Sequence, residues 1–356
     1  MLIQEIHKIV VRAPNWIGDA VMCTPALLDL RASYPRAHIT LWGRPAIVEL
    51  LKGHPGIDHV MSYEHQGVHS GLLGKYRLIK QLRLARFDLA ILLQNAFEAA
   101  FLTFLAGIPN RWGYGTDGRS FLLSKAVPVA SQKRSAHQVQ YYQLLMQSLV
   151  GRIRSRGLQL VLSNQDEKRI DQRFPELMTS RGDYLIGLNP GSVYGSSKRW
   201  LPDRFAELAE RVMNQIQETV GSNANVTCVV VGGVGEESLA HAISSLMRSN
   251  TIVLTGKTTL RELMGIIKRC SLFLTNDTGP MHIAAAFNVP MVAIFGSTDP
   301  HHTAPYGLED MVVQGKASCS PCFLRSCPID HRCMTQVSVQ QAYEVAMKQF
   351  LRKEQG

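Results

Sequence analysis

The chain has 356 residues, of which 46% are hydrophobic and 19% are charged, and its formal net charge is +10. This composition is typical of a folded globular protein and excludes a disordered chain. The sequence has neither an apolar run of about 18 residues nor a secretory signal, so we expect a cytoplasmic protein without transmembrane helices. The chain is longer than a typical domain with one hydrophobic core, so its length predicts two domains.

The chain opens on a predicted strand, loop and helix. Residues 7–12 favour a strand and residues 13–19 a loop. A helical stretch follows, whose first residue stays open because Thr24 also suits a position just before a helix. Asp19 therefore lies in the turn after the first strand, where open α/β sheets present catalytic groups.

Strand-like and helical segments then alternate through both halves of the chain. The further predicted strands are residues 38–42, 89–93, 184–188, 226–231, 251–254, 272–275 and 291–295. Helices are expected between them, for example over residues 203–215 and 259–269. This alternation predicts an α/β protein with two doubly wound, Rossmann-like parallel sheets. A polar stretch over residues 163–183 contains the expected boundary, between domains of residues 1–175 and 176–335.

Basic residues are concentrated in the first half of the chain. Residues 1–175 hold 22 of the 38 Lys and Arg residues but only 12 of the 28 Asp and Glu residues. Arg77, Lys80 and Arg83 recur every third residue, which places them near one another on a predicted helix. Such a stripe is either a solvated face or a dock for a polyanion. The candidate polyanions are nucleic acid, an anionic membrane surface, and an acceptor that carries phosphates and acidic sugars.

Two glycine-containing turns follow strands of the second half. Gly191 and Ser192 follow the strand at 184–188, and Lys198 comes shortly after them; this is the pattern of a diphosphate clamp or of a solvated surface loop. The turn after the strand at 226–231 lacks the third glycine of a dinucleotide fingerprint, so it is a weak signal.

A third turn joins the strand at 272–275 to a predicted helix. Asp277, Thr278 and Gly279 form this turn, and Pro280 suits the first helical position. Backbone N–H groups and the helix dipole at such a turn favour a phosphate or diphosphate. The carboxylate of Asp277 suits sugar hydroxyls, so the pair indicates a nucleotide-sugar site. The alternative is that Asp277 only caps the helix and Gly279 only makes the turn.

Seven cysteines fall into two groups. Cys23, Cys228 and Cys270 lie in apolar segments and are expected in the core. The other four lie within fifteen residues, a density that suits either a structural zinc site or ligand-free reduced thiols: Cys319, Cys322, Cys327 and Cys333.

In their order and spacing, the motifs resemble the ADP-heptose:lipopolysaccharide heptosyltransferases of glycosyltransferase family 9, nearest to the second heptosyltransferase of that group. The resemblance spans almost the whole chain. It rests on Asn15-Trp16-Ile17-Gly18-Asp19-Ala20, Ala106-Gly107-Ile108-Pro109-Asn110-Arg111, Asn189-Pro190-Gly191-Ser192, Lys198-Arg199-Trp200 and Thr275-Asn276-Asp277-Thr278-Gly279-Pro280-Met281-His282.

The resemblance implies a GT-B architecture, in which two such domains face each other across a cleft. It also implies that the final helix, within residues 336–356, returns to the first domain. The implied reaction is heptose transfer with inversion from ADP-heptose to the lipopolysaccharide inner core, with no cofactor required for catalysis. The implied acceptor is Kdo-lipid A that bears the first heptose, met at the cytoplasmic face of the inner membrane.

Residue roles follow from the same resemblance. Asp19 is the expected general base. The expected donor ligands are Lys198, Asp277, Thr278, Gly279, Gly191, Ser192, and Glu236 or Glu237, between which the sequence does not choose. The expected acceptor ligands are basic residues of the first domain, namely Arg77, Lys80, Arg83, Arg111 and Arg119. Two rivals stay open: a glycosyltransferase with another donor or acceptor, and a nucleic-acid-binding module. The second rival leaves the Asp19, Lys198 and Asp277 motifs unexplained, so we expect no nucleic-acid partner.

Overall fold

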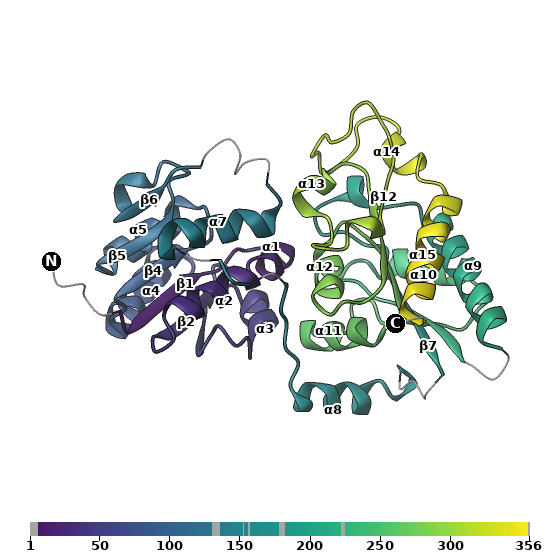
Figure 1. The fold of residues 1–356 in the computed structure, drawn as a ribbon, viewed down its shortest axis with the longest axis horizontal. Coiled ribbons are helices and arrows are strands. Elements are labelled where there is room, and N and C mark those ends of the chain that lie inside the picture. Colours follow the sequence, from purple (N-terminus) through teal and green to yellow (C-terminus); the bar gives the residue numbers. More distant parts are fainter. Residues whose placement is uncertain are drawn as a thin grey trace. The chain divides into compact units, whose positions relative to one another are not determined.

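The computed structural model describes residues 6–129, 136–151, 153–155, 157–177, 182–221 and 225–354. The chain forms two compact units, Met1–Val161 and Leu162–Gly356. Each unit holds one six-stranded parallel sheet with helices packed around it (Figure 1). None of the helices in the described ranges has both the length and the apolarity needed to cross a membrane.

The sheet of the first unit has the strand order β3-β2-β1-β4-β5-β6. Its strands are β1 (Lys8–Arg12), β2 (His38–Gly43), β3 (His59–Ser62), β4 (Leu89–Leu92), β5 (Asn110–Tyr114) and β6 (Lys125–Val127). The helices of this unit are α1 (Ile17–Met22), α2 (Thr24–Ser33), α3 (Pro45–Leu51), α4 (Gly71–Ala85), α5 (Phe97–Leu105) and α7 (Gln138–Val150).

The sheet of the second unit has the order β12-β11-β10-β7-β8-β9. Its strands are β7 (Tyr184–Asn189), β8 (Val226–Val230), β9 (Thr251–Val253), β10 (Leu272–Asn276), β11 (Met291–Phe295) and β12 (Val312–Gln314). Its helices are α8 (Asn164–Arg173), α9 (Pro202–Val220), α10 (Glu237–Leu246), α11 (Leu260–Arg269), α12 (Gly279–Ala286), α13 (Pro300–Thr303), α14 (Arg332–Thr335) and α15 (Val339–Glu354).

Both sheets reverse their strand order at one point. In the first sheet β1 lies between β2 and β4, and in the second sheet β7 lies between β8 and β10. Helices on either side of such a point lie on opposite faces of the sheet, which opens a crevice at the carboxyl ends of the two central strands. The fold thus confirms the predicted pair of doubly wound parallel sheets, and it directs attention to the residues that follow β1, β4, β7 and β10.

The predicted single helix after β1 is two helices. Helix α1 ends at Met22 and α2 begins at Thr24, with Pro25 in the first turn of α2. The Thr24 hydroxyl donates a hydrogen bond to the Val21 carbonyl oxygen at 2.7 Å. Asp19, expected in a loop, therefore lies in the first turn of α1, where a carboxylate interacts favourably with the helix dipole.

The boundary between the units falls before residue 162, earlier than the predicted 175. The reason is α8, which packs on α11 within the second unit. Three ion pairs join the two helices: Asp166 with Arg261, Asp171 with Arg269, and Glu167 with Lys268. The polar stretch of the sequence therefore holds a helix of the second unit as well as the connection.

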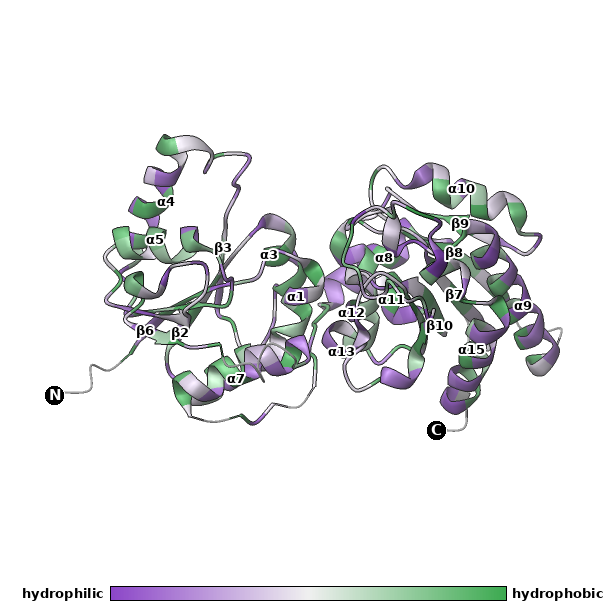
Figure 2. Cartoon of the chain, turned by 90° about the horizontal axis from the view of Figure 1, so that it is seen from above, coloured by the Kyte–Doolittle hydropathy of each residue, from purple (hydrophilic) through white to green (hydrophobic). Residues whose placement is uncertain are grey.

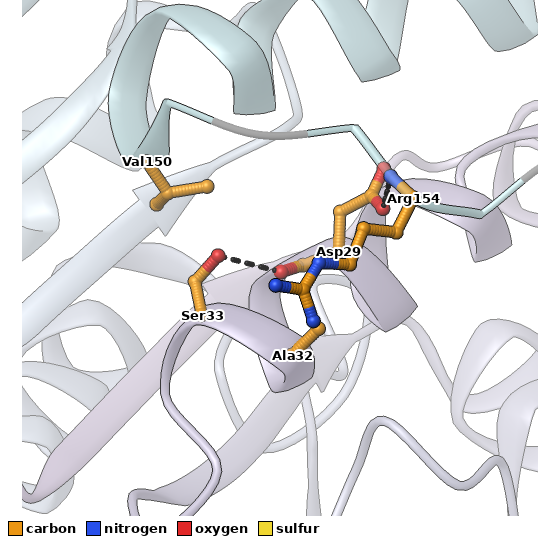
Figure 3. A pocket seen from close by; sticks show the side chains of 5 residues that line it. All are labelled: Asp29, Ala32, Ser33, Val150 and Arg154. Carbon is orange, nitrogen blue, oxygen red and sulfur yellow. Dashed lines mark hydrogen bonds between the residues drawn. The ribbon is translucent and has the colours of Figure 1, made fainter.

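The buried carboxylate of Asp29 holds the start of the connecting segment against the first unit. Asp29 on α2 accepts hydrogen bonds through Oδ1 from the backbone N–H groups of Arg154 at 2.8 Å and Ser155 at 2.9 Å. Figure 3 shows Asp29 beside Arg154, with the Ser33 hydroxyl donating to the Asp29 carbonyl oxygen at 2.9 Å. Residues 154–155 are thereby held against α2.

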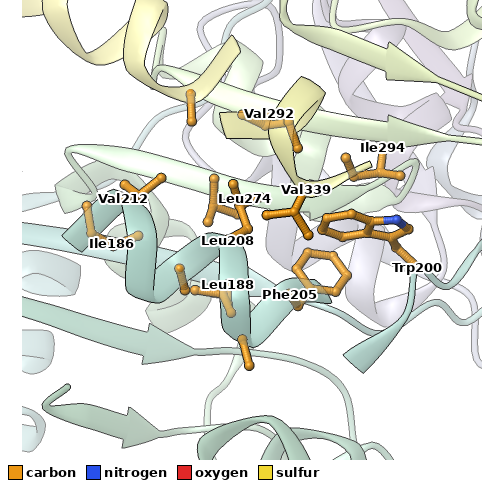
Figure 4. Packing of buried hydrophobic residues seen from close by; sticks show 14 of the residues in the cluster. Ile186, Leu188, Trp200, Phe205, Leu208, Val212, Leu274, Val292, Ile294 and Val339 are labelled. Carbon is orange, nitrogen blue, oxygen red and sulfur yellow. The ribbon is translucent and has the colours of Figure 1, made fainter. Parts of the chain in front are cut away.

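The core of the second unit lies between its sheet and helices α9 and α15. Trp200, Phe205 and Leu274 pack here with side chains from β7 and β11 (Figure 4). We expected the final helix to return to the first domain. Instead, Ala346 and Phe350 of α15 are fully buried in this core, because the apolar face of the helix lies on α9 and on strands β10 and β11.

Candidate nucleotide-sugar site

Buried polar side chains gather at the carboxyl ends of β7, β10 and β11 in the second unit. Such groups are rarely buried without a structural or functional reason, because each needs a hydrogen-bond partner. The buried set comprises Asn189, Ser192, Ser197, Thr275, Asn276, Asp277, Ser297 and Thr298. This is the point where the strand order reverses, and ligands bind there in open α/β sheets.

Two asparagine side chains join the three motifs that the sequence singled out in this half. Asn276 accepts a hydrogen bond from the backbone N–H of Trp200 at 3.1 Å and donates one to the Pro190 carbonyl oxygen at 2.8 Å. Asn189 donates to the Thr278 hydroxyl at 2.9 Å. The Asn189–Ser192 turn, the Lys198 segment and the Asp277 turn are therefore one constellation, as the sequence predicted.

Lys198 and Asp277 form a buried ion pair at the centre of this constellation. Lys198 Nζ lies 2.5 Å from Asp277 Oδ2, and the two side chains are 13% and 4% exposed. The Thr298 hydroxyl donates to the same Oδ2 atom at 2.6 Å. Two donors thus satisfy one carboxylate oxygen, which offsets part of the cost of removing both charges from water.

The turn after β10 is suited to an anion. Helix α12 begins at Gly279, and the first N–H groups of a helix have no partner within it. Within the described ranges no side chain caps α12, because the Thr278 hydroxyl is engaged with Asn189. The Ser192 hydroxyl is also buried without a hydrogen-bond partner among the described residues. These donors and the Lys198 ammonium belong to the three segments that Asn189 and Asn276 join, and each is of a kind that stabilises a diphosphate.

The structure separates Glu236 from Glu237. Glu236 accepts a hydrogen bond from Gly233 N–H at 2.9 Å, and a Cβ atom added at Gly191 would meet its Oε2 at 2.1 Å. Glu237 accepts from Gly235 N–H at 2.8 Å, and its Oε1 would meet a Cβ atom added at Gly256 at 2.3 Å. Only Glu236 therefore borders the Asn189–Ser192 turn.

The five basic residues that the sequence offered as acceptor ligands divide into two groups. Arg77, Lys80 and Arg83 are exposed on α4. Arg119 is fully buried, donates to the carbonyl oxygens of Tyr114 at 3.0 Å and Ala96 at 3.2 Å, and burial lowers its pKa to about 10. Its guanidinium holds the loops after β4 and β5, so the structure gives Arg119 a structural role and nothing in it supports the expected acceptor role.

Arg111 also makes internal contacts. Its Nε donates to the Leu122 carbonyl oxygen at 2.7 Å, and its guanidinium lies over the Phe104 ring at 5.3 Å from the ring centre. Burial lowers the pKa of Arg111. The structure thus gives this side chain a packing role at the start of β5.

Sequence reasoning missed Arg12, which is almost fully buried at the carboxyl end of β1. Its guanidinium lies 4.9 Å from the centre of the Trp42 ring and donates to Asn15 Oδ1 at 2.8 Å. Desolvation lowers the pKa of Arg12 to about 10. Arg12 fixes the loop that leads into Asp19, which is half-buried. The sequence signal that could have identified Arg12 is a basic residue at the end of an otherwise apolar strand.

A family model described as "Glycosyltransferase family 9 (heptosyltransferase)" matches residues 75–332. The chain belongs to glycosyltransferase family 9. This membership confirms the resemblance that the motifs indicated and the prediction that the protein is a glycosyltransferase.

Relatives of known name agree with this assignment. Lipooligosaccharide heptosyltransferase 2 of Haemophilus influenzae is 30% identical over 310 residues, which cover 84% of this chain and 86% of the relative. Lipopolysaccharide heptosyltransferase 2 of Salmonella typhimurium is 29% identical over 327 residues, which cover 86% and 88%. The predicted similarity to the second heptosyltransferase of the group is thereby confirmed.

Solved structures share the fold over nearly the full length. The structure of the E. coli ADP-heptose lipopolysaccharide heptosyltransferase II has a TM-score of 0.79 at 26% identity and covers 98% of this chain and 99% of its own. A family 9 glycosyltransferase from Veillonella parvula has a TM-score of 0.86 at 23% identity and covers 99% of both chains. These neighbours support the GT-B fold class.

The cysteines divide as the sequence indicated. Cys23, Cys228 and Cys270 are buried in apolar surroundings, which confirms them as core residues. Of the other four, Cys333 is buried, Cys322 and Cys327 are half-buried, and Cys319 is exposed. In the parts of the chain that the structure describes, no group of three or more His, Cys, Asp or Glu side chains is arranged to hold a metal ion. A structural zinc stays a prediction that elemental analysis of the purified enzyme tests.

The central ion pair leads to a stability prediction. Asp277→Ala leaves the Lys198 ammonium buried without its partner, which should lower the free energy of unfolding by about 3–5 kcal/mol. Glu167→Ala breaks the exposed pair with Lys268 in the same unit and should cost less than about 1 kcal/mol. Urea unfolding of both variants measures the difference, and equal losses would contradict the buried pair.

Proposed function

We propose that this enzyme transfers a heptose, with inversion, from ADP-heptose to the inner core of lipopolysaccharide. The proposed acceptor is Kdo-lipid A that already carries the first heptose, so the product carries the second. The observation that carries the proposal is the meeting of the Asn189–Ser192 turn, Lys198 and Asp277 at the reversal point of the second sheet. Relatives named heptosyltransferase 2 support the choice of sugar and acceptor.

The reaction is a single displacement at the anomeric carbon of the heptose. The acceptor hydroxyl oxygen forms a bond to this carbon while the bond to the diphosphate oxygen breaks. The leaving diphosphate takes the electron pair, and Lys198 with the first N–H groups of α12 stabilises its growing charge. These groups supply positive charge at the leaving oxygen, so the proposal assigns no divalent metal to the transfer step.

Each donor ligand has a separate task in this proposal. Asp277 accepts hydrogen bonds from heptose hydroxyls, Ser192 donates to the diphosphate, and Glu236 accepts from the ribose. Glu236 is preferred to Glu237 because its carboxylate borders Gly191. Arg199 Nη2 lies 3.5 Å from Glu236 Oε1, and the carboxylate oxygens of Glu236 can accept hydrogen bonds from a ribose hydroxyl.

The most direct test supplies purified enzyme with ADP-heptose and lipopolysaccharide truncated after the first heptose. We expect ADP release, together with a product whose mass has grown by one heptose. An acceptor that lacks the first heptose and a UDP-sugar donor are the matched controls. Equal turnover with either control would contradict the proposed specificity, and no turnover with the proposed pair would contradict the function.

Donor variants separate binding of the diphosphate from binding of the sugar. Lys198→Ala should weaken ADP and ADP-heptose to the same extent, because both ligands carry the diphosphate. Asp277→Asn keeps a hydrogen-bonding side chain and should weaken ADP-heptose more than ADP. Calorimetric titration measures both ligands, and equal losses for Asp277→Asn would argue against its contact with the heptose.

Asp19 is the proposed general base. It lies after β1, at the carboxyl end of the first sheet, where the fold presents functional groups. Asp19→Ala should lower kcat about 10²–10⁴-fold, the usual range for loss of a general base, and leave the affinity for ADP unchanged. Single-turnover rates together with ADP titration measure the two effects. A variant with near-normal turnover would remove Asp19 from this role.

The first unit is the proposed partner of the acceptor and of the membrane surface that carries it. Arg77, Lys80 and Arg83 are exposed on α4, which is basic and carries apolar residues along its length (Figure 2). Leu72 and Leu73 at the start of the same helix are 90% and 76% exposed. Exposed apolar side chains beside basic ones suit an anionic lipid surface. We therefore place the enzyme at the cytoplasmic face of the inner membrane.

Reversing charge on α4 tests this assignment. The variant Arg77→Glu/Lys80→Glu/Arg83→Glu should raise the KM for the acceptor and leave the KM for ADP-heptose unchanged. The effect should shrink at high salt, since the Debye length falls from about 8 Å at physiological ionic strength to about 3 Å at 1 M. Lys257→Glu/Lys268→Glu/Lys348→Glu in the second unit is the control. An unchanged acceptor KM would contradict this assignment and show that the basic residues of α4 only face solvent.

A further inference from the structure

The loop that carries the four clustered cysteines lies directly against the Lys198 segment. Tyr194 donates its hydroxyl proton to the Phe323 carbonyl oxygen at 2.5 Å. The backbone N–H of Ser197 donates to the Arg325 carbonyl oxygen at 3.1 Å, and the Ser197 hydroxyl donates to that of Leu324. Residues 194–197 are therefore paired with residues 323–325, far away in the sequence.

The approach between the two segments is too close for a side chain at residue 195. A Cβ atom added at Gly195 would meet the Arg325 carbonyl oxygen at 2.1 Å. That oxygen belongs to the backbone and has no rotamer by which to move away. Gly195 is followed by the single turn Ser196–Lys198, whose last residue carries the ammonium of the central ion pair.

One side chain of the cysteine loop also contacts the backbone just before Lys198. His331 Nε2 lies 3.0 Å from the Ser197 carbonyl oxygen. A carbonyl oxygen only accepts, so Nε2 carries the proton and donates it. His331 has a left-handed backbone with φ of 57°, an unusual conformation for a residue with a Cβ atom. The imidazole thus holds the carbonyl that directly precedes Lys198 in the chain.

We propose that His331 is a positioning residue that fixes Lys198 for the leaving diphosphate. The imidazole restrains the Ser197 carbonyl, and the Ser196–Lys198 turn transmits this restraint to the ammonium beside Asp277. The inference rests on the proposed function in one respect, the contact of Lys198 with the diphosphate. It gives the cysteine loop a task in donor binding, where the sequence indicated only a structural zinc site or ligand-free reduced thiols.

A double-mutant cycle separates positioning from general structural support. A hydrogen bond of this kind changes an equilibrium about 2- to 10-fold. His331→Ala should therefore weaken ADP binding 2- to 10-fold, and His331→Gln, whose amide can donate to the same carbonyl, should restore most of the affinity. In a Lys198→Ala background His331→Ala should have no further effect, because it acts through Lys198. Calorimetric titration with ADP measures all four corners of the cycle.

Arg332→Ala is the matched control, because Arg332 is next in the chain and pairs with Asp330 at the surface. It should leave ADP affinity and melting temperature unchanged. The proposal is wrong if His331→Ala leaves ADP affinity unchanged, or if it weakens ADP equally with and without Lys198. It is also wrong if His331→Gln behaves as His331→Ala does.

A second measurement needs no nucleotide. Lys198 is nearly buried and ion-paired, so an acylating reagent should label it slowly in the native enzyme. His331→Ala should accelerate the labelling of Lys198 and leave that of Lys268 on α11 unchanged, as read by peptide mass spectrometry. Equal labelling of Lys198 in both proteins would overturn the proposal. Wild-type enzyme that binds no ADP would contradict the proposed function instead, and the labelling would still decide whether His331 holds Lys198.

Discussion

The buried ion pair between Lys198 and Asp277 is the constraint on which the second unit depends. Two opposite charges at the end of β10 are costly to bury, so the surrounding side chains must satisfy their remaining hydrogen-bonding capacity. Thr298 from beyond β11 does this for Asp277. Asn189 donates to the Thr278 hydroxyl, and Asn276 holds the backbone at Pro190 and Trp200. The same contacts hold the ammonium beside Asp277, which precedes α12, so that the cation is in position before any anion arrives.

The two units share one sheet topology, but different side chains lie at the carboxyl ends of their central strands. The first sheet ends in a buried guanidinium, Arg12, whose hydrogen bond to Asn15 orders the loop before Asp19. The second sheet ends in amides, hydroxyls and the ion pair. The proposed general base and the proposed diphosphate site need different surroundings, and each unit has a strand-order reversal at which one of them lies.

The fold class and the segments that form the candidate donor site could be predicted because their signals are local. The central strands are continuous apolar runs, and the turns after β7 and β10 carry their functional residues within a few positions. Edge strands such as β3 and β6 were missed because they are short and partly exposed. The burial of Arg119 was not foreseen because a sequence shows charge but not burial. The expectation that the final helix returns to the first domain came from the resemblance, whereas α15 packs on α9, a contact between distant segments that no motif shows.

The sequence motifs do not show contacts between distant segments. Two glycines, at each of which another segment approaches closely, show why such contacts matter. Gly191 admits the Glu236 carboxylate and Gly195 admits the Arg325 carbonyl, so both glycines are explained by a neighbour from elsewhere in the chain. In the sequence they only resemble turn residues. The glycine at 191 brings a candidate ribose ligand to the site. The glycine at 195 lets the cysteine loop reach the residue before Lys198, so the candidate donor ligands depend on contacts from a segment far away in the sequence.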